Sequence, residues 1–334
     1  MAAGVFATVE KSSLQHRVVA VKSYKAQHGR LVKRHCEREL RALRAIRANS
    51  ELHAWEHHVI YLLDVQKNPS ECNLLFPFYD KTLLDLVSSC DQIFAFNAVY
   101  QLAQGLDFLH DQGIIHCDLS PSNVLVDSTN NNHMVIADFG CAHFIMQHVT
   151  DDSAPSDMEE QDNEEIGTLI YKAPEHLFGS RLYAPSTDIW SLGCIFCHLL
   201  RGDPLFTGES DIEQIGQLVR IMGPPPTTVL NEEMCRYPDA DKLIFFGDPA
   251  DHDSSSSHCD DDDDDIISEE DDSAEYADLM AMISAQRQAY ANLLAVPYAR
   301  PLIQGMLNWS VRNRLSTSEI FKLAKDRDDN QIEE

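Results

Sequence analysis

Apolar and polar residues alternate over short runs in the first part of the chain, which is the pattern of β-strands. Val5, Ala7 and Val9 share one face, and a second apolar run covers 18–22. The polar residues at 11–13 separate the two runs. The pattern predicts two paired strands with a turn at 11–13.

Helical spacing follows at 31–48, where apolar residues recur every three positions with Arg and Glu between them. The residues that carry this spacing are Leu40, Leu43 and Ile46. Two further apolar runs, 59–65 and 74–78, flank Asn68-Pro69-Ser70 and predict a second hairpin. The first 80 residues therefore predict a small sheet with one helix.

Beyond position 80 the apolar residues have mainly helical spacing. Helices are predicted at 96–110, 187–200, 211–222 and 280–294, with two more within 301–325. A sheet-rich part followed by a helix-rich part indicates an α+β fold with two lobes. We expect an N-lobe at 1–79, a C-lobe at 80–325 and a polar tail at 326–334.

The formal net charge of −28 disfavours nucleic acid and anionic membranes as partners, because phosphates would be repelled. Much of the acid lies at 248–278, with fifteen Asp and Glu and no Lys or Arg. Such a segment cannot bury enough apolar surface to order itself, so we predict a disordered insertion within the C-lobe. Two functional alternatives stay open: a docking arm for basic partners, or a phosphorylated switch.

Nine cysteines without a regular framework predict reduced thiols and a location in the nucleus and cytoplasm. The spacing of Cys194 and Cys197 is that of metal ligands, but no second pair follows, so we interpret them as buried helix thiols. The longest apolar run, near 190–200, is too short to span a bilayer. The start of the chain lacks the pattern of a signal peptide.

Three polar residues follow strand-like apolar runs and suit phosphoryl transfer. Asp118 and Asn123 lie on one short loop, and Asp138 comes fifteen residues after Asn123. A carboxylate such as Asp118 can accept the proton of an attacking hydroxyl. Asn123 and Asp138 offer hard oxygen ligands for Mg²⁺ on phosphates.

The order His116-x-Asp118-Leu119-x-x-x-Asn123 followed by Asp138-Phe139-Gly140 resembles the protein kinase family. The resemblance extends from Gly4 to about Leu323. Further matching positions are Lys22, Ala173-Pro174-Glu175, Asp188 and Arg314. It implies a two-lobed protein-kinase fold, ATP as phosphate donor, Mg²⁺ as cofactor and a protein substrate.

The resemblance also assigns the nucleotide site. Lys22 would grip the phosphates, with Glu39 as its partner on the helix and Glu37 as the alternative. Gly4 is the one glycine kept from the family's glycine-rich loop. Val9 and Ala20 would lie against the adenine.

The linker between the lobes would hold the adenine base. By resemblance Phe76 is the gatekeeper, and the backbone of Pro77 and Tyr79 binds the base. An ordinary core strand is the alternative interpretation of this apolar run.

Four positions either differ from the family pattern or bear on the substrate. They lie in the loop at 116–123, called the catalytic loop, and in the segment from Asp138 to Glu175, called the activation segment. Cys117 replaces the arginine that reads an activation-segment phosphate in the family, and Asn163 stands where cyclin-dependent kinases carry the phosphate acceptor. Ser120 replaces a lysine that contacts the transferring phosphate, a loss of about 10²–10³ in rate for one such donor. Thr168 matches the threonine that bonds the catalytic Asp in serine/threonine kinases.

The segments at 203–214 and 222–225 are similar to cyclin-dependent kinases, and especially to the cell-cycle-related and CDK-activating branch. This similarity implies a serine/threonine kinase, expected to be a monomer, whose candidate substrate is the activation threonine of another cyclin-dependent kinase. A cyclin partner is left open, because the helix around Glu39 lacks the sequence through which cyclin-dependent kinases contact a cyclin. The rival interpretation is a pseudokinase that binds nucleotide with little transfer; a small-molecule kinase is disfavoured.

Overall fold

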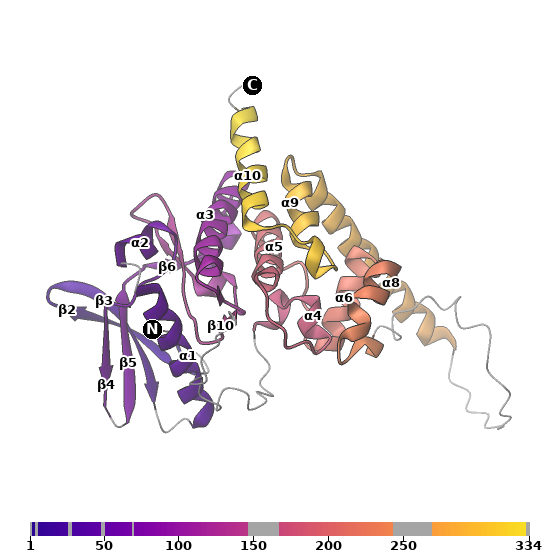
Figure 1. Ribbon diagram of the computed structural model, residues 1–334. Coiled ribbons are helices and arrows are strands. Elements are labelled where there is room, and N and C mark those ends of the chain that lie inside the picture. Colours follow the sequence, from indigo (N-terminus) through magenta and orange to yellow (C-terminus); the bar gives the residue numbers. More distant parts are fainter. Residues whose placement is uncertain are drawn as a thin grey trace.

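The computed structural model describes residues 2–3, 6–25, 29–47, 51–68, 70–145, 167–242 and 269–331. A β-sheet with the helix α1 forms one part of the molecule, and a bundle of helices forms the other (Figure 1). The predicted α+β fold with two lobes is confirmed. The last strand of the sheet ends at Pro77, and the helical part begins after it.

The N-terminal sheet is antiparallel with the strand order β1-β2-β3-β5-β4. Its strands are β1 (Ala2–Ala3), β2 (Thr8–Leu14), β3 (Arg17–Lys25), β4 (Asp64–Lys67) and β5 (Glu71–Pro77). In the register, Lys22 lies opposite Val9 on one side and Leu74 on the other. This pairing fixes which face of the sheet the Lys22 side chain occupies.

The turn predicted at 11–13 was wrong, because β2 continues through these residues. The chain reverses at Gln15 and His16, whose φ angles are 46° and 69°. Two left-handed residues match the twist of a tight hairpin. The polar residues at 11–13 are exposed on the strand, so their polarity reflects solvent and not a turn.

The second hairpin exists, but its first strand lies later than predicted. β4 begins at Asp64, whereas Val59 forms an isolated bridge to Ile136 in the other lobe. Val59, Ile60 and Leu62 are buried without alternation. The apolar run at 59–65 therefore belongs mostly to a segment packed between the lobes.

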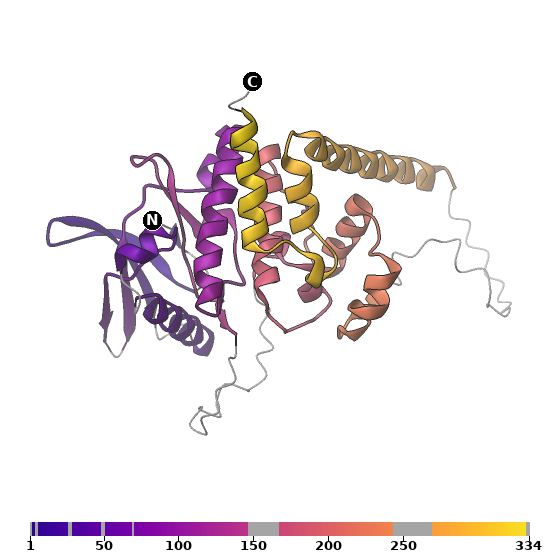
Figure 2. The ribbon, with the colours of Figure 1, turned by 45° about the horizontal axis from the view of Figure 1, so that its top comes forward.

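The helices of the second part surround a core built on two of them, α3 and α5, which pack against each other. Their bounds are α3 (Gln92–Asp111), α4 (Pro174–Leu177), α5 (Pro185–Arg201), α6 (Asp211–Met222), α7 (Thr227–Glu232), α8 (Glu269–Ala295), α9 (Ala299–Met306) and α10 (Thr317–Gln331). In the other lobe lie α1 (Arg30–Arg47) and α2 (Glu51–Glu56). α10 runs beside α3 (Figure 2), and it extends the fold into the predicted polar tail.

The prediction of a disordered insertion at 248–278 was wrong for its last part, because α8 begins at Glu269. The helix predicted at 280–294 is the later part of α8. Positions 248–268 lie outside the described residues.

Strands of two small sheets flank the loop at 116–123, with β7 before it and β8 after it. Their strands are β6 (Lys81–Thr82), β8 (Val124–Asp127) and β9 (His133–Ile136) in one, and β7 (Ile114–Ile115) with β10 (His143–Phe144) in the other. A short 3₁₀ helix, Leu84–Ser89, leads from β6 to α3, and another, Pro121–Asn123, leads from β7 to β8. None of the helices in the described part of the chain is long and apolar enough to cross a membrane. Cys194 and Cys197 are buried in α5, as the interpretation of helix thiols expects.

Candidate active site

Lys22 is the centre of a buried charge network between the lobes. Its Nζ lies 3.0 Å from Glu39 Oε1 on α1 and 2.8 Å from Asp138 Oδ1. The Lys22 and Glu39 side chains are 10% and 1% exposed, whereas that of Asp138 is 44% exposed. One ammonium group thus ties β3, α1 and the segment after β9 together.

The electrostatics of this network favour the ion pair of Lys22 with Asp138. Burial opposes the charged form of Lys22, but Asp138 and Glu39 outweigh it and raise its pKa. Burial likewise opposes the Asp138 carboxylate, but Lys22 outweighs it and the pKa of Asp138 is lowered. Burial raises the pKa of Glu39. Lys22 therefore stays charged, and Asp138 keeps the carboxylate that a cation needs.

Tyr24 belongs to this network, and the sequence reasoning missed it. Its hydroxyl donates to Glu39 Oε2 at 2.5 Å. Tyr24 comes two residues after Lys22 on β3, so both side chains lie on the same face of the sheet. That spacing could have identified it. The alternative partner, Glu37, instead pairs with Lys33 at the surface of α1, 3.8 Å away.

Asp118 is held by two neutral neighbours. Its Oδ1 accepts hydrogen bonds from the backbone N and the Oγ1 of Thr168, at 2.8 and 2.7 Å. Asn123 Nδ2 donates to the Asp118 carbonyl at 2.7 Å and to Oδ2 at 3.2 Å. The carboxylate is half-buried and fixed in orientation, as a group that accepts a proton from a bound hydroxyl requires.

Asp188 stabilises the catalytic loop through hydrogen bonds to its backbone. This buried side chain accepts hydrogen bonds from the backbone N of His116 and Cys117, both at 2.9 Å, and lies 2.8 Å from His110 Nε2. Burial opposes its ionisation, but the bond from His110 outweighs it and lowers the pKa of Asp188. Cys117 has a left-handed φ of 66°, a backbone conformation that costs about 1–3 kcal/mol. The hydrogen bonds from the backbone N of His116 and Cys117 to Asp188 hold the loop in this conformation. Sequence reasoning missed His110, because nothing local marks it.

The register of β8 and β9 brings Asn123 and Asp138 together. Ala137 N donates to the Asn123 carbonyl at 2.9 Å. Asn123 directly precedes β8 and Asp138 comes two residues after β9, so the two metal-ligand candidates lie at the same open end of one hairpin. Asp138 also has a left-handed φ, 68°. Phe139 is fully buried against the His116 ring, 5.4 Å between centroids.

These groups fit Mg²⁺. Asn123 uses its amide nitrogen on Asp118, which leaves its side-chain oxygen to face a cation, and Asp138 supplies a carboxylate. Among the described residues no three His, Cys, Asp or Glu side chains form a complete metal cage. Mg²⁺ on a nucleotide needs only one or two protein ligands, because phosphates and water supply the rest.

The residues assigned to the nucleotide lie on the sheet strands beside Lys22. Ala20 on β3 pairs with Phe76 on β5, and Val9 on β2 pairs with Lys22. Phe76 is buried, while Val9 and Ala20 are half-buried. Gly4 lies outside the described residues.

The linker between the lobes begins where β5 ends. Pro77 is the last residue of β5, and Tyr79 follows in the linker, where burial raises the pKa of its hydroxyl. Both are half-buried. Phe6, from the loop before β2, stacks on His35 of α1 with 3.7 Å between ring centroids.

The two unusual positions of the catalytic loop carry small, buried side chains. Cys117 is 7% exposed and packs with Ile115, Cys141 and Tyr183. Ser120 is buried, and its Oγ lies 3.0 Å from the Oγ of Ser122. Neither position supplies a cation. Asn163 and the acidic residues around it lie outside the described residues.

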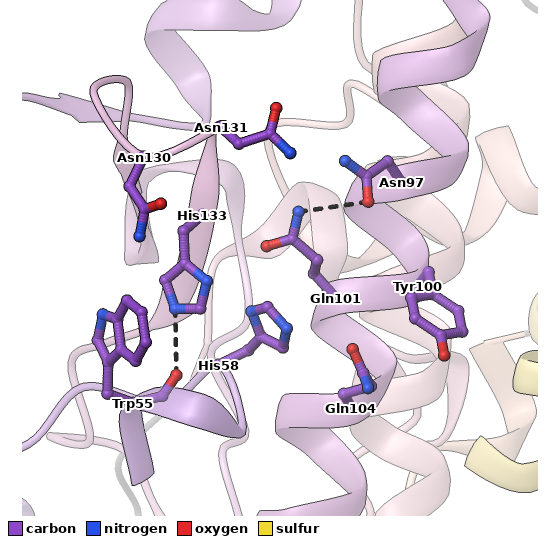
Figure 3. Close-up of a pocket in the computed structure, with 9 residues that line it drawn as sticks. All are labelled: Trp55, His58, Asn97, Tyr100, Gln101, Gln104, Asn130, Asn131 and His133. Atoms are coloured by element: carbon purple, nitrogen blue, oxygen red, sulfur yellow. Dashed lines mark hydrogen bonds between the residues drawn. The ribbon is translucent and has the colours of Figure 1, made fainter. Parts of the chain in front are cut away.

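A separate hollow of about 360 Å³ opens between the end of α2, α3 and the turn before β9 (Figure 3). Amide, imidazole and aromatic side chains line it: Trp55, His58, Asn97, Tyr100, Gln101, Gln104, Asn130, Asn131 and His133. Two hydrogen bonds join lining residues: His133 Nε2 lies 3.1 Å from the Trp55 carbonyl, and Gln101 Nε2 donates to Asn97 Oδ1 at 3.4 Å (Figure 3). The hollow holds none of the phosphoryl-transfer residues.

The environment of His58 in this hollow predicts that the folded protein loses stability in acid. Burial lowers its pKa to about 4, whereas an unfolded histidine titrates near 6.5. The unfolded state therefore binds more protons between these values, so stability is lost as the pH falls from about 6.5 to about 4. His58→Asn keeps a donor for the Met134 carbonyl, which His58 Nδ1 contacts at 2.8 Å.

We expect His58→Asn to lose less stability than the wild type over this pH range, by up to about 3 kcal/mol. Unfolding measured at a series of pH values checks this. His16→Asn on the exposed β2–β3 turn is the control and should keep the wild-type slope. Equal slopes for all three proteins would contradict the assignment.

Comparison with known proteins agrees with this geometry. The sequence model of the family described as protein kinase domain matches residues 1–324. Cyclin-dependent kinase 20 of Danio rerio is 33% identical over 62% of this chain and 58% of its own length. Cell division control protein 2 homolog 3 of Trypanosoma brucei brucei is 36% identical over 55% and 56%, and cyclin-dependent kinase-like 2 of Oryctolagus cuniculus is 30% identical over 62% and 34%. The chain thus spans less than two thirds of the length of these relatives.

Proposed function

The chain belongs to the protein kinase domain family, and we propose that it is a cyclin-dependent-type serine/threonine kinase that transfers phosphate from ATP to a protein. The observation that carries this proposal is the connected ion-pair network of Lys22, Glu39 and Asp138 beside an oriented Asp118. A protein kinase needs both the ion pair between its strand lysine and helix glutamate, here Lys22 and Glu39, and an Asp placed to hold Mg²⁺, here Asp138. The relatives with cyclin-dependent kinase names support the type.

In the proposed reaction Asp118 orients the substrate hydroxyl and accepts its proton. Lys22 holds the phosphates, and Asn123 and Asp138 hold Mg²⁺. When bound, Mg²⁺ neutralises charge on the β- and γ-phosphates. Thr168 fixes Asp118 through two hydrogen bonds, which supports a serine or threonine hydroxyl as acceptor.

The rival function is a pseudokinase, and Ser120 is the position that favours it. This neutral hydroxyl bonds Ser122 and leaves the transferring phosphate without the lysine that the family places there. One lost donor of this kind costs about 10²–10³ in rate, which slows transfer but does not abolish it. The complete Lys22–Glu39–Asp138 network makes the slower enzyme the better proposal.

We also propose that activity does not require a phosphate on the activation segment. The support is the buried cluster around Cys117, where a thiol packs against Tyr183 in place of a phosphate-binding arginine. Arg38 of α1 lies close enough to influence the pKa of Tyr183, so one cation remains nearby. The Lys22–Glu39 pair is nevertheless formed in the unphosphorylated chain.

The proposed substrate is the activation threonine of another cyclin-dependent kinase. This step rests on the similarity of 203–214 and 222–225 to the CDK-activating branch. The proposed monomer acts in the nucleus and cytoplasm, where the free cysteines of the described residues would stay reduced. The proposal includes no cyclin.

The test is a transfer assay with phosphatase-treated protein, ATP, Mg²⁺ and an inactive cyclin-dependent kinase as substrate. We expect phosphate on the substrate's activation threonine, and none on a substrate with alanine there. Asp138→Ala removes a metal ligand and should abolish the signal. Mass spectrometry of the active protein checks that 141–172 carries no phosphate.

Each outcome bears on a different part of the proposal. Equal signal from wild type and Asp138→Ala would refute the enzyme and favour the pseudokinase. Activity that disappears on phosphatase treatment would refute the independence from phosphorylation alone. Phosphate on a general peptide but not on the activation threonine would refute only the substrate.

A further inference from the structure

Two cysteines join α1 to the sheet beside the Lys22–Glu39 pair. Cys36 lies on α1, three residues before Glu39, and therefore on nearly the same helix face. Cys72 lies on β5, and its partner in the ladder is Tyr24 of β3. Since Tyr24 bonds Glu39, the cross-strand pair of Tyr24 and Cys72 faces the helix segment that carries Cys36 and Glu39.

The two thiols are neighbours. Cys72 lies close enough to Cys36 to contribute to the raised pKa of the Cys36 thiol. Cys36 is buried, 6% exposed, and Cys72 is half-buried within the same core. Both are free thiols. Burial raises the pKa of the Cys36 thiol to about 12, so Cys36 does not react first with an oxidant.

We propose that Cys36 and Cys72 are a redox modification site that forms a disulfide when the protein meets a peroxide. Cys72, the more exposed thiol, reacts with hydrogen peroxide to give a sulfenic acid and water. The Cys36 sulfur then attacks the Cys72 sulfur and displaces its hydroxyl. The hydroxyl takes the Cys36 proton and leaves as a second water, so two thiols lose two hydrogens and two electrons to the peroxide.

The disulfide would fix α1 against β5. Glu39 is one helical turn from Cys36, so the bond would hold the helix where Glu39 reaches Lys22 at 3.0 Å. A bond between positions 36 and 72 also closes a long loop, which restricts the unfolded chain. The oxidised protein should therefore be more stable and should keep the ion pair formed.

The experiment treats the full chain with hydrogen peroxide, blocks the remaining thiols with N-ethylmaleimide and digests without reductant. We expect a cross-linked pair of peptides containing Cys36 and Cys72, lighter by two hydrogens than the sum of the two. We also expect a rise in Tm of about 5–10 °C that dithiothreitol reverses. Neither readout depends on kinase activity, so failure of the proposed function leaves this test intact.

Matched variants separate this pair from the other thiols. Cys36→Ser and Cys72→Ser should each lose both the cross-link and the Tm shift. Cys235→Ser, on an exposed cysteine, and Cys141→Ser, beside Cys117, should keep both. A cross-link between Cys117 and Cys141 with Cys36 still alkylated would overturn the proposal, as would sulfinic acid on Cys72 with Cys36 reduced.

Discussion

Replacing Asp118 by asparagine is expected to lower the rate of phosphoryl transfer by about 10²–10⁴-fold. Asparagine keeps the size of the side chain and an oxygen for the Thr168 bonds of 2.7 and 2.8 Å. It cannot accept the proton of the substrate hydroxyl. Because Lys22 and Asp138 are untouched, the affinity for Mg²⁺-bound ATP should change by less than about twofold. Transfer kinetics and nucleotide titration measure the two quantities separately.

Asp64→Asn is the matched control for this experiment. It makes the same chemical change on an exposed aspartate of β4, and both the rate and the affinity should stay at the wild-type level. A rate for Asp118→Asn within about tenfold of the wild type would remove Asp118 from its proposed role. A parallel loss of nucleotide affinity would mean that the loop itself had changed shape.

The residues of the site could be predicted from the sequence because their neighbours in the chain position them. Asp118 and Asn123 share one loop, and Asp138 follows a strand that pairs with the strand after Asn123. The helix period also separates Glu39, on the buried face, from Glu37 on the exposed face. Short-range patterns are enough where each residue is held by an element next to it.

Two contacts that arise only from tertiary packing were missed. His110 reaches Asp188 across 78 positions of sequence, and the contact of Cys117 with Tyr183 joins the catalytic loop to the segment before α5. The position of the β2–β3 turn was also missed, because polar residues on an exposed strand look like a turn. Polarity alone indicates exposure to solvent, and only pairing decides whether exposed residues form a strand or a turn.

Replacing Arg314 by leucine is expected to lower the free energy of unfolding by about 3–5 kcal/mol. Arg314 Nη1 and Nη2 donate to the two Glu175 oxygens at 2.7 and 2.6 Å, and Glu175 is 3% exposed. Burial opposes ionisation of Glu175, but Arg314 outweighs it and lowers the pKa of Glu175. Without Arg314 a buried carboxylate is left unpaired. Two backbone carbonyls, of Asn308 and Ser186, also lose their donors.

Denaturant unfolding of four variants, with Glu175→Leu measured alone as well, tests whether the loss comes from the pair. Arg312→Leu, the same change two residues away on an exposed side chain, should cost less than about 0.5 kcal/mol. Combining Arg314→Leu with Glu175→Leu removes both charges and should recover much of the loss, because no unpaired carboxylate remains. If the double variant were as unstable as the sum of the single changes, the carboxylate would not be the cause. The bond of Arg314 to Ser186, at the start of α5, would then carry the larger share, since it links this arginine to the helix that holds Asp188.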